Sequence, residues 1–323
     1  MTLSPSPLPL GIDIGATRVR IAQLDSLGSQ AHLRRVIAFD IPDSDSGRAA
    51  DAVGRAIAHH LSEFEIRERR CVCAIGEDAG TVRPVALPQM PARERMSAVR
   101  FEAARIVDYA LDDALVRVRP LDPARNIFAL GIVRRSAYER KLAIVRAAGL
   151  RIVCVDHEAF ALRRAFPRAD AAIDIGSMWA RFYALRSETP FGVAVAGGSA
   201  ALTHALERSL AIDPALAERR KRTIGLAGAG ETELVALCAA IGQALFAARK
   251  NGAGEIQHVV LVGNGARLQG LLERLERGTG CSIEFATEPA IAASPYPSDV
   301  IRASAPDWSL SIGLALRDEG DAA

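Results

Sequence analysis

The chain has 323 residues, of which 50% are hydrophobic and 24% charged, a composition typical of a globular protein with one large or two medium domains. Its 40 Lys and Arg residues nearly balance 38 Asp and Glu residues, so the charge gives no reason to expect nucleic acid as a partner. Five cysteines without CxxC or Cys/His spacing argue against a disulfide framework and a zinc site. The proline-containing residues 1–9 do not resemble a signal peptide, and we find no run of about eighteen apolar residues that predicts a membrane span.

The first predicted element is a strand, a tight turn and a second strand. Residues 12–24 read IDIGATRVRIAQL, an apolar strand that ends in an Asp and a Gly before a mixed second strand. A glycine at such a turn lets backbone N–H groups approach a phosphate closely. An Asp at the end of the preceding strand can hold a hydrated Mg²⁺ beside that phosphate. Asp13 and Gly15 are therefore candidate phosphate-site residues.

Alternating helices and strands follow a polar loop at residues 40–47. Hydrophobic periodicity predicts, in chain order, helix 51–65, strand 72–75, helix 93–108, strand 126–134, helix 137–148 and strand 151–156. Gly149 fits the left-handed cap that ends many helices. This alternation is typical of an α/β protein, and we expect two lobes that meet near residue 165.

A second copy of the hairpin opens the second half. Residues 173–185, IDIGSMWARFYAL, align without a gap to residues 12–24 and match Asp13 to Asp174, Gly15 to Gly176 and Arg20 to Arg181. Two such copies indicate an internal duplication. Hairpins that face each other would clamp a polyphosphate, with Asp13 and Asp174 holding Mg²⁺ through water. The alternative is two unrelated hairpins whose Asp side chains only cap turns.

Residues 258–272, HVVLVGNGARLQGLL, predict a strand, a small-residue turn at 263–266 and an amphipathic helix. A turn of this kind suits a flat adenosine packed on backbone. Before it, Gly197 and Gly198 form a turn that either touches phosphate or only connects two elements. The Pro- and Ser-rich residues 288–307 indicate an irregular crossing.

The order of hairpin, inserted subdomain, second hairpin and glycine turn resembles that of actin, Hsp70 and sugar kinases. Within that superfamily the chain is most similar to PilM, the cytoplasmic actin-like protein of type IV pilus assembly. The resemblance covers nearly the whole chain. It is carried by GIDIGATRVRIAQL at the start, VRFEAARIVDYALDDA at 99–114, LAIVRAAGLRIVCVDHEAFAL at 142–162, AERRKR at 217–222 and SIGLALR at 311–317.

The resemblance implies a duplicated actin-like, ribonuclease-H-like α/β fold with an inserted small α+β subdomain. The first lobe would span residues 1–165 and include the insertion at about 80–150. The second would span 166–323, with the last helix returning to the interface. The implied cofactors are ATP and Mg²⁺. The implied nucleotide-binding residues are Asp13, Gly15, Ala16, Thr17, Arg18, Asp174, Gly176, Ser177, Gly198, Glu218, Lys221, Gly263, Asn264 and Gly265.

The family implies a scaffold under the inner membrane, within the pilus inner-membrane platform, with no membrane insertion of its own. Its partner would be the cytoplasmic N-terminal tail of a PilN-like protein, bound in a groove among residues 71–160. The chain departs from the family at Asn264, where another Gly is usual, although Asn tolerates left-handed backbone. Met178 and Trp179 replace small hydroxyl residues, so we expect at most a weak ATPase.

Two other functions stay open at the level of sequence. A small-molecule kinase of the same superfamily, similar to type III pantothenate kinase, would place a catalytic carboxylate near Asp156 or Glu158. Those carboxylates can equally be strand-end groups that hydrogen-bond a loop. A nucleotide-free docking module similar to GspL of type II secretion is the other alternative, although the retention of both Asp-Gly pairs speaks against it.

Overall fold

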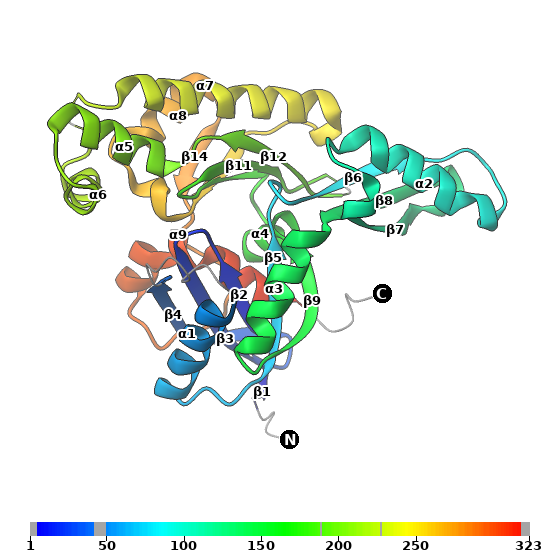
Figure 1. Ribbon diagram of the computed structural model, residues 1–323, viewed down its shortest axis with the longest axis horizontal. Helices are drawn as coiled ribbons and strands as arrows, with labels where there is room; N and C mark the ends of the chain where they lie inside the picture. The colour runs from blue at the N-terminus through cyan, green and yellow to red at the C-terminus, as the bar shows by residue number, and fades with distance from the viewer. Residues whose placement is uncertain (1–4, 42–49, 188, 227, 318–323) are drawn as a thin grey trace.

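The computed structural model describes residues 5–41, 50–187, 189–226 and 228–317. Two lobes, each built on its own sheet, lie one above the other in Figure 1, and a smaller sheet with one helix projects to the side. The expected polar loop at 40–47 lies mostly outside the described residues.

The first sheet begins with an antiparallel hairpin and continues with parallel strands. Its order is β1-β3-β2-β5-β9, and β4 pairs with β3. The strands are β1 (Ser6–Pro7), β2 (Leu10–Ile14), β3 (Arg18–Leu27), β4 (Gln30–Asp40), β5 (Arg70–Ile75) and β9 (Arg151–His157). Helices α1 (Ala50–Glu63) and α3 (Arg135–Ala147) pack together and contribute to a core with Ile12, Ile57 and Ile144.

The second sheet repeats this plan. Its order is β12-β11-β10-β13-β14, with β10 and β11 antiparallel and β10, β13 and β14 parallel. The strands are β10 (Ala171–Ile175), β11 (Trp179–Ala184), β12 (Phe191–Ala196), β13 (His258–Val262) and β14 (Ser282–Phe285). The helices of this lobe are α5 (Ser199–Leu210), α6 (Pro214–Thr223), α7 (Glu231–Ala248) and α8 (Leu271–Thr279), with turns η3 (Arg249–Ala253) and η4 (Asn264–Arg267).

The projecting part is an antiparallel sheet covered by one helix. Strands β6 (Gly80–Ala86), β8 (Ile127–Arg134) and β7 (Ala114–Asp122) lie in that order, and α2 (Ala92–Ile106) packs on them through Val99 and Ala103. Short turns η1 (Leu111–Asp113) and η2 (Pro123–Arg125) complete it. The sheet ends at Arg134, and α3 that follows packs on α1 of the first lobe.

Two helices lie between the lobes, α4 (Glu158–Ala165) and α9 (Ser298–Ala315). A Cβ at Gly11 would lie 1.9 Å from the Ser311 carbonyl oxygen, so α9 packs directly on β2. The irregular crossing expected at 288–307 is wrong from Ser298 onward, because helix α9 starts there and includes Pro306. Pro306 lacks an N–H donor, but its carbonyl accepts a hydrogen bond from the Gly263 N–H at 2.9 Å.

One described segment, Glu231–Ala253, is long and apolar enough to cross a membrane by length and composition alone. In the structure, one face of α7 within this segment packs into the second lobe through Leu234, Leu237, Ile241 and Leu245. The helix therefore contributes to the core of that lobe.

Candidate functional site

The two repeated hairpins have the same local geometry. The Gly15 N–H donates to the Arg18 carbonyl at 2.9 Å, and the Gly176 N–H donates to the Trp179 carbonyl at 3.0 Å. A Cβ at Gly15 or Gly176 would approach those same carbonyl oxygens to 3.0 and 2.9 Å. The glycines are needed because each turn closes on its own backbone. The sequence repeat thus corresponds to a structural repeat.

Each hairpin also carries an Asp–Arg pair across its two strands. Asp13 lies opposite Arg20, and Asp174 lies opposite Arg181. The guanidinium Nη1 of Arg20 is 3.3 Å from Asp13 Oδ2, and that of Arg181 is 3.1 Å from Asp174 Oδ2. The sequence alignment matched the two arginines but assigned them no role. They are the counter-charges of the two candidate metal-site carboxylates.

The two hairpins face each other closely enough for their charges to interact. Burial, helped by the negative charges of Glu158 and Asp13, raises the pKa of Asp174 to about 7, although Arg181 and Arg20 oppose the shift. Asp13 and Asp174 belong to different lobes. The charges of Asp13 and Arg20 in the first sheet act on Asp174 in the second, so the two hairpins lie near each other.

The third turn lies against the second hairpin. Gly263 has φ +88°, and a Cβ there would lie 2.3 Å from Asp174 Oδ1. A Cβ at Gly265 would lie 2.4 Å from a methyl carbon of Ile175. The left-handed residue of this turn is Gly263, whereas Asn264 is the first residue of η4 and does not have positive φ. The change from Gly to Asn at 264 therefore needs no left-handed backbone.

The start of α5 also packs on the second hairpin. The N–H groups of Ser199 and Ala200 donate to the carbonyls of Gly176 and Ser177, both at 2.9 Å. A Cβ at Gly198 would lie 2.4 Å from the Ser177 carbonyl oxygen. Ser177 and Gly198, both predicted binding residues, are thus neighbours. On the first hairpin, Ala16 and Thr17 are exposed at the turn, and Arg18 lies 3.5 Å from Asp40 and 3.9 Å from Asp307.

Glu218 and Lys221 of α6 bind each other and α5. The buried Lys221 Nζ lies 2.7 Å from Glu218 Oε2 and donates to the Ser199 carbonyl at 2.9 Å and to Thr203 Oγ1 at 2.7 Å. Burial alone would raise the pKa of Glu218, but hydrogen bonds from Lys221 and Thr203 outweigh it and lower the pKa to about 2. The three ammonium N–H donors of Lys221 are thus matched by protein oxygens.

The two candidate catalytic carboxylates lie in different environments. Asp156 is buried, binds Arg164 of α4 and lies 3.1 Å from Arg317 Nη1, just beyond α9. Glu158 begins α4, accepts a hydrogen bond from the Tyr183 hydroxyl and lies 3.7 Å from Arg181 Nε. Glu158 therefore joins the charges around Asp174, whereas the contacts of Asp156 are with the arginines behind α4.

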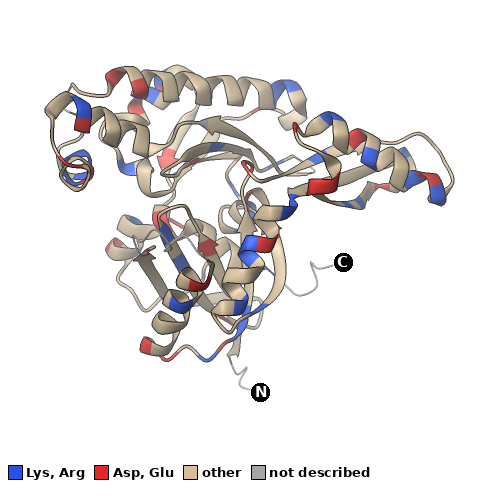
Figure 2. Cartoon of the chain, in the orientation of Figure 1, with Lys and Arg blue, Asp and Glu red and all other residues tan. Residues whose placement is uncertain are grey.

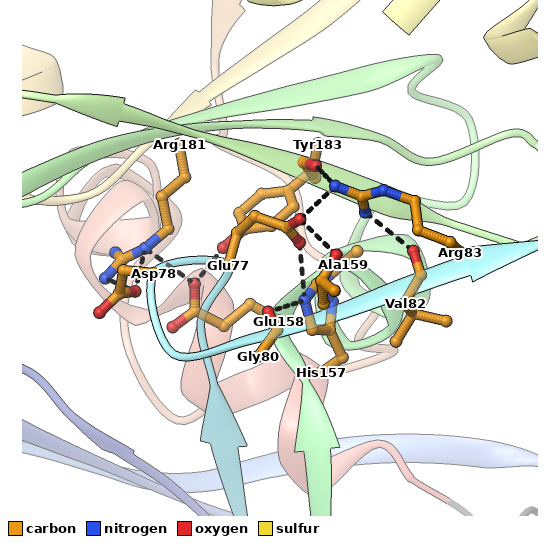
Figure 3. Close-up of polar contacts among 12 residues, drawn as sticks. Glu77, Asp78, Gly80, Val82, Arg83, His157, Glu158, Ala159, Arg181 and Tyr183 are labelled. Atoms are coloured by element: carbon orange, nitrogen blue, oxygen red, sulfur yellow. Dashed lines mark hydrogen bonds and ion pairs between the residues drawn. The ribbon is translucent and has the colours of Figure 1, made fainter. Parts of the chain in front are cut away.

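Sequence reasoning missed a polar cluster where the first lobe, the second lobe and the small sheet meet (Figure 3). Asp78, in the turn before β6, accepts hydrogen bonds from Arg181 at 2.6 and 2.9 Å. Its neighbour Glu77 lies 2.5 Å from Arg83 and 3.1 Å from His157. Arg83 also donates to the Gly192 carbonyl of the second lobe at 2.9 Å. No local sequence motif predicts these contacts.

The residues present fit a water-mediated Mg²⁺. Three arginines of the two hairpins, Arg18, Arg20 and Arg181, contact more carboxylates than their charges can balance, namely Asp13, Asp40, Asp78, Glu158, Asp174 and Asp307. The local charge is therefore negative, which favours a cation beside a polyphosphate. Within the described ranges no group of three or more His, Cys, Asp or Glu side chains forms a direct metal-binding cluster. A metal held through water does not need one.

Duplicated sheets, paired Asp-Gly hairpins and a glycine turn between two lobes define a protein of the actin-like fold. The chain is similar to a solved chain of a PilM-PilN type IV pilus biogenesis complex, with TM-score 0.83 and 27% identity over 96% of this chain and 98% of that chain. A model of the family described as type IV pilus assembly protein PilM matches residues 11–319, so the chain belongs to that family.

More distant structures share the fold alone. The ethanolamine utilization protein EutJ from Carboxydothermus hydrogenoformans has TM-score 0.57 and 16% identity over 98% of this chain and 91% of its own. A MamK double helical filament has TM-score 0.51 and 12% identity over 95% and 97%. The duplicated actin-like fold and the family predicted from the sequence are confirmed.

Proposed function

We propose that the chain is a cytoplasmic ATP-binding scaffold of type IV pilus assembly that docks the N-terminal tail of a PilN-like inner-membrane protein. The observation that supports this most is the similarity, over nearly the full length, to the chain of the PilM-PilN complex. Association with the membrane would then come through that partner.

The nucleotide would lie between the two hairpins. Gly15 to Arg18 and Gly176 to Ser177 would contact phosphates through backbone N–H groups and side chains, and Gly263 to Gly265 would pack on the adenosine. Asp13 and Asp174 would hold Mg²⁺ through water, and Mg²⁺ would neutralise phosphate charge. Glu218 and Lys221 would support this side of the site by fixing α6 on α5.

Hydrolysis would be weak at most. Met178 and Trp179 follow Ser177 at the second turn, and 58% and 38% of their surfaces are exposed. Neither side chain offers a hydroxyl donor to a terminal phosphate. A small-molecule kinase would need a poised base, but Asp156 is held by two arginines and Glu158 by Tyr183 and Arg181. These contacts favour the scaffold.

The partner tail would bind on the small subdomain. Helix α2 buries Val99 and Ala103 but leaves 66% of Phe101 and 50% of Met96 exposed. An exposed Phe on a helix that covers a small sheet is a candidate anchor for an extended peptide. The end of this small sheet that lies nearest the two lobes is held in place by the contacts of Glu77, Asp78 and Arg83. The subdomain would therefore hold a defined position beside the proposed nucleotide site.

Calorimetry with Mg-ATP tests the nucleotide site. Asp13→Ala and Asp174→Ala should each weaken binding by about 1–3 kcal/mol, the scale of a lost contact to a charged group. The matched control is Asp112→Ala, because Asp112 is 96% exposed on the small subdomain. Equal affinity for all four proteins would reject the assignment.

Crosslinking of a PilN-like tail peptide tests the partner site. Crosslinks should map to residues 71–160, and Phe101→Ala should weaken capture, whereas Phe246→Ala, a similarly exposed Phe on α7, should not. Because the chain has a formal net charge of only +2, capture should depend little on salt. Crosslinks beyond residue 180 would show that the docking site is elsewhere.

A further inference from the structure

The outward face of α7 carries a regular stripe that neither nucleotide nor tail binding uses. Its exposed residues follow the alternating spacing of four and three that defines the seam of a coiled coil. They are Thr232, Ala236, Ala239, Gln243, Phe246 and, in the following turn, Lys250. Val235 beside them is 51% exposed, and Phe246 is 59% exposed. The opposite face, with Leu234, Leu237, Ile241 and Leu245, is buried in the lobe.

Charge along α7 is confined to its two ends. Glu231 and Glu233 lie in the first turn, Arg249 and Lys250 follow the last, and the residues between them carry no charged group. Figure 2 shows α7 as the outermost helix of the second lobe, tan over most of its length. Such a face meets water without the charged residues that usually cover a surface helix.

We propose that α7 packs against α7 of a second copy of this chain, antiparallel, around a two-fold axis near residues 240 and 241. In this arrangement Val235 of one copy lies opposite Phe246 of the other, and Glu231 lies opposite Lys250. Ala239 of one copy lies opposite Gly242 of the other, and these two small residues allow the helix axes to approach closely. Because both copies present the same surface, the contact closes on itself as a dimer.

The charges select this orientation. A parallel pair would place Glu231 beside Glu231 and Lys250 beside Lys250, whereas the antiparallel pair joins opposite charges and opposes the two helix dipoles. Glu231 already pairs with Arg274 at 2.7 Å, yet its side chain remains 51% exposed and accessible to a second cation. Lys250 lies over the Phe246 ring, 5.0 Å from its centroid, so both belong to the same end of the stripe.

A second copy suits this face better than a lipid surface does. Helices that lie on membranes carry Lys and Arg along their polar face, whereas α7 has bases only at one end and acids at the other. A helix of 18 residues is about 27 Å long, and one helix pair falls well short of the roughly 800 Å² per partner of a standard interface. The dimer is therefore weak and concentration-dependent.

Sedimentation of the full chain over a roughly hundredfold range of concentration tests the proposal. The mass should rise from 34.4 kDa toward twice that value. Ala239→Arg places a charge at the centre of the stripe and should keep the chain monomeric. The matched control is Ala215→Arg, at an exposed position of α6, which should leave self-association unchanged. Both replaced alanines are exposed, so both variants should fold, and circular dichroism checks this.

Spin labels determine the orientation, in a background in which the partly exposed Cys154 and Cys238 are replaced by Ala. Labels at position 239 of the two copies should lie within about 15 Å, and labels at position 250 about 28 Å apart along the axis. Short distances at both positions would mean a parallel pair and would overturn the proposal. So would a chain that stays monomeric throughout, whether or not it binds vesicles of anionic phospholipid, or a dimer that persists in Ala239→Arg.

Discussion

Replacing Lys221 by Met tests whether the Glu218–Lys221 pair fixes α6 on α5. Methionine keeps the buried aliphatic stem of Lys221 but removes its ammonium group, and with it the contacts to Glu218, Ser199 and Thr203. Burial lowers the pKa of Lys221, so placing its charge there costs free energy that Met does not require. Because Met avoids the free-energy cost of a buried charge, the variant loses only part of the stability that the hydrogen bonds to Ser199 and Thr203 contribute.

Most of the expected loss in the free energy of unfolding comes from Glu218. Its pKa lies near 2 in the folded protein against 4.5 for an unperturbed Glu, a difference that corresponds to about 3 kcal/mol without screening. The Glu218 side chain is 34% exposed and keeps Arg222 at 2.8 Å, so we reduce the value by about half. With the lost bonds included, Lys221→Met should lower the free energy of unfolding by about 2 kcal/mol at neutral pH.

Urea unfolding at several pH values measures this difference. A carboxylate whose pKa is lowered by folding stabilises the protein fully above its unfolded pKa, and this contribution is lost as pH falls from 4.5 toward 2. The difference in unfolding free energy between the original chain and Lys221→Met should therefore be constant from about pH 5 to neutral pH and narrow below that range. Arg222→Met is the control, because Arg222 touches the same carboxylate but is 54% exposed, and it should cost less than about 1 kcal/mol. Equal losses in both variants, or a gap that does not change with pH, would refute the reasoning.

Three further changes test the interlobe site. Gly263→Ala should lower the free energy of unfolding by about 1–3 kcal/mol in urea titrations, because φ is +88° and the new Cβ would meet Asp174; a neutral result would contradict the close approach. Tyr183→Phe should cost about 1–3 kcal/mol by the same method, since the buried Glu158 loses a donor, and an unchanged midpoint would argue against that bond. The fluorescence of Trp179 should change on addition of Mg-ATP while phosphate release stays slow, and rapid release abolished by Asp174→Ala would show that the second turn supports hydrolysis.

The two hairpins could be predicted because the residues that define each of them lie close together in the sequence. An apolar strand, an Asp and a Gly occur within a few residues, and the second copy repeats them without a gap. Helices α1, α2 and α3 and strands β5, β8 and β9 were predicted for the same reason, since hydrophobic periodicity is a local signal, whereas strands β6 and β7 of the small sheet were missed. Gly149, expected as a left-handed cap, indeed has φ +68°.

The charge partners could not be predicted because they are distant in the chain. Arg181 binds Asp78, 103 residues away, and Arg20 binds Asp307, 287 residues away. The equivalence of Arg20 and Arg181 was visible, but nothing local indicated which carboxylates they meet. The irregular structure expected around Pro306 was wrong for another reason. A Pro usually interrupts a helix because it lacks an N–H donor, but here tertiary contacts keep it within α9. The nucleotide-site residues and the lobe boundaries remain predictions.

The position of α9 has a consequence for synthesis on the ribosome. The N-terminal lobe contains the first strands to be made, yet the core around Ala22, Leu24 and Leu33 is completed by Ile312 and Ala315. Domains usually fold as units during translation. Here β2 and β3 would leave the ribosome with one apolar face uncovered, and that face stays exposed to water until helix α9 has been synthesised. The nascent chain should therefore depend on chaperones until α9 has been synthesised, and a frameshift just before α9 would damage the first lobe as severely as the second.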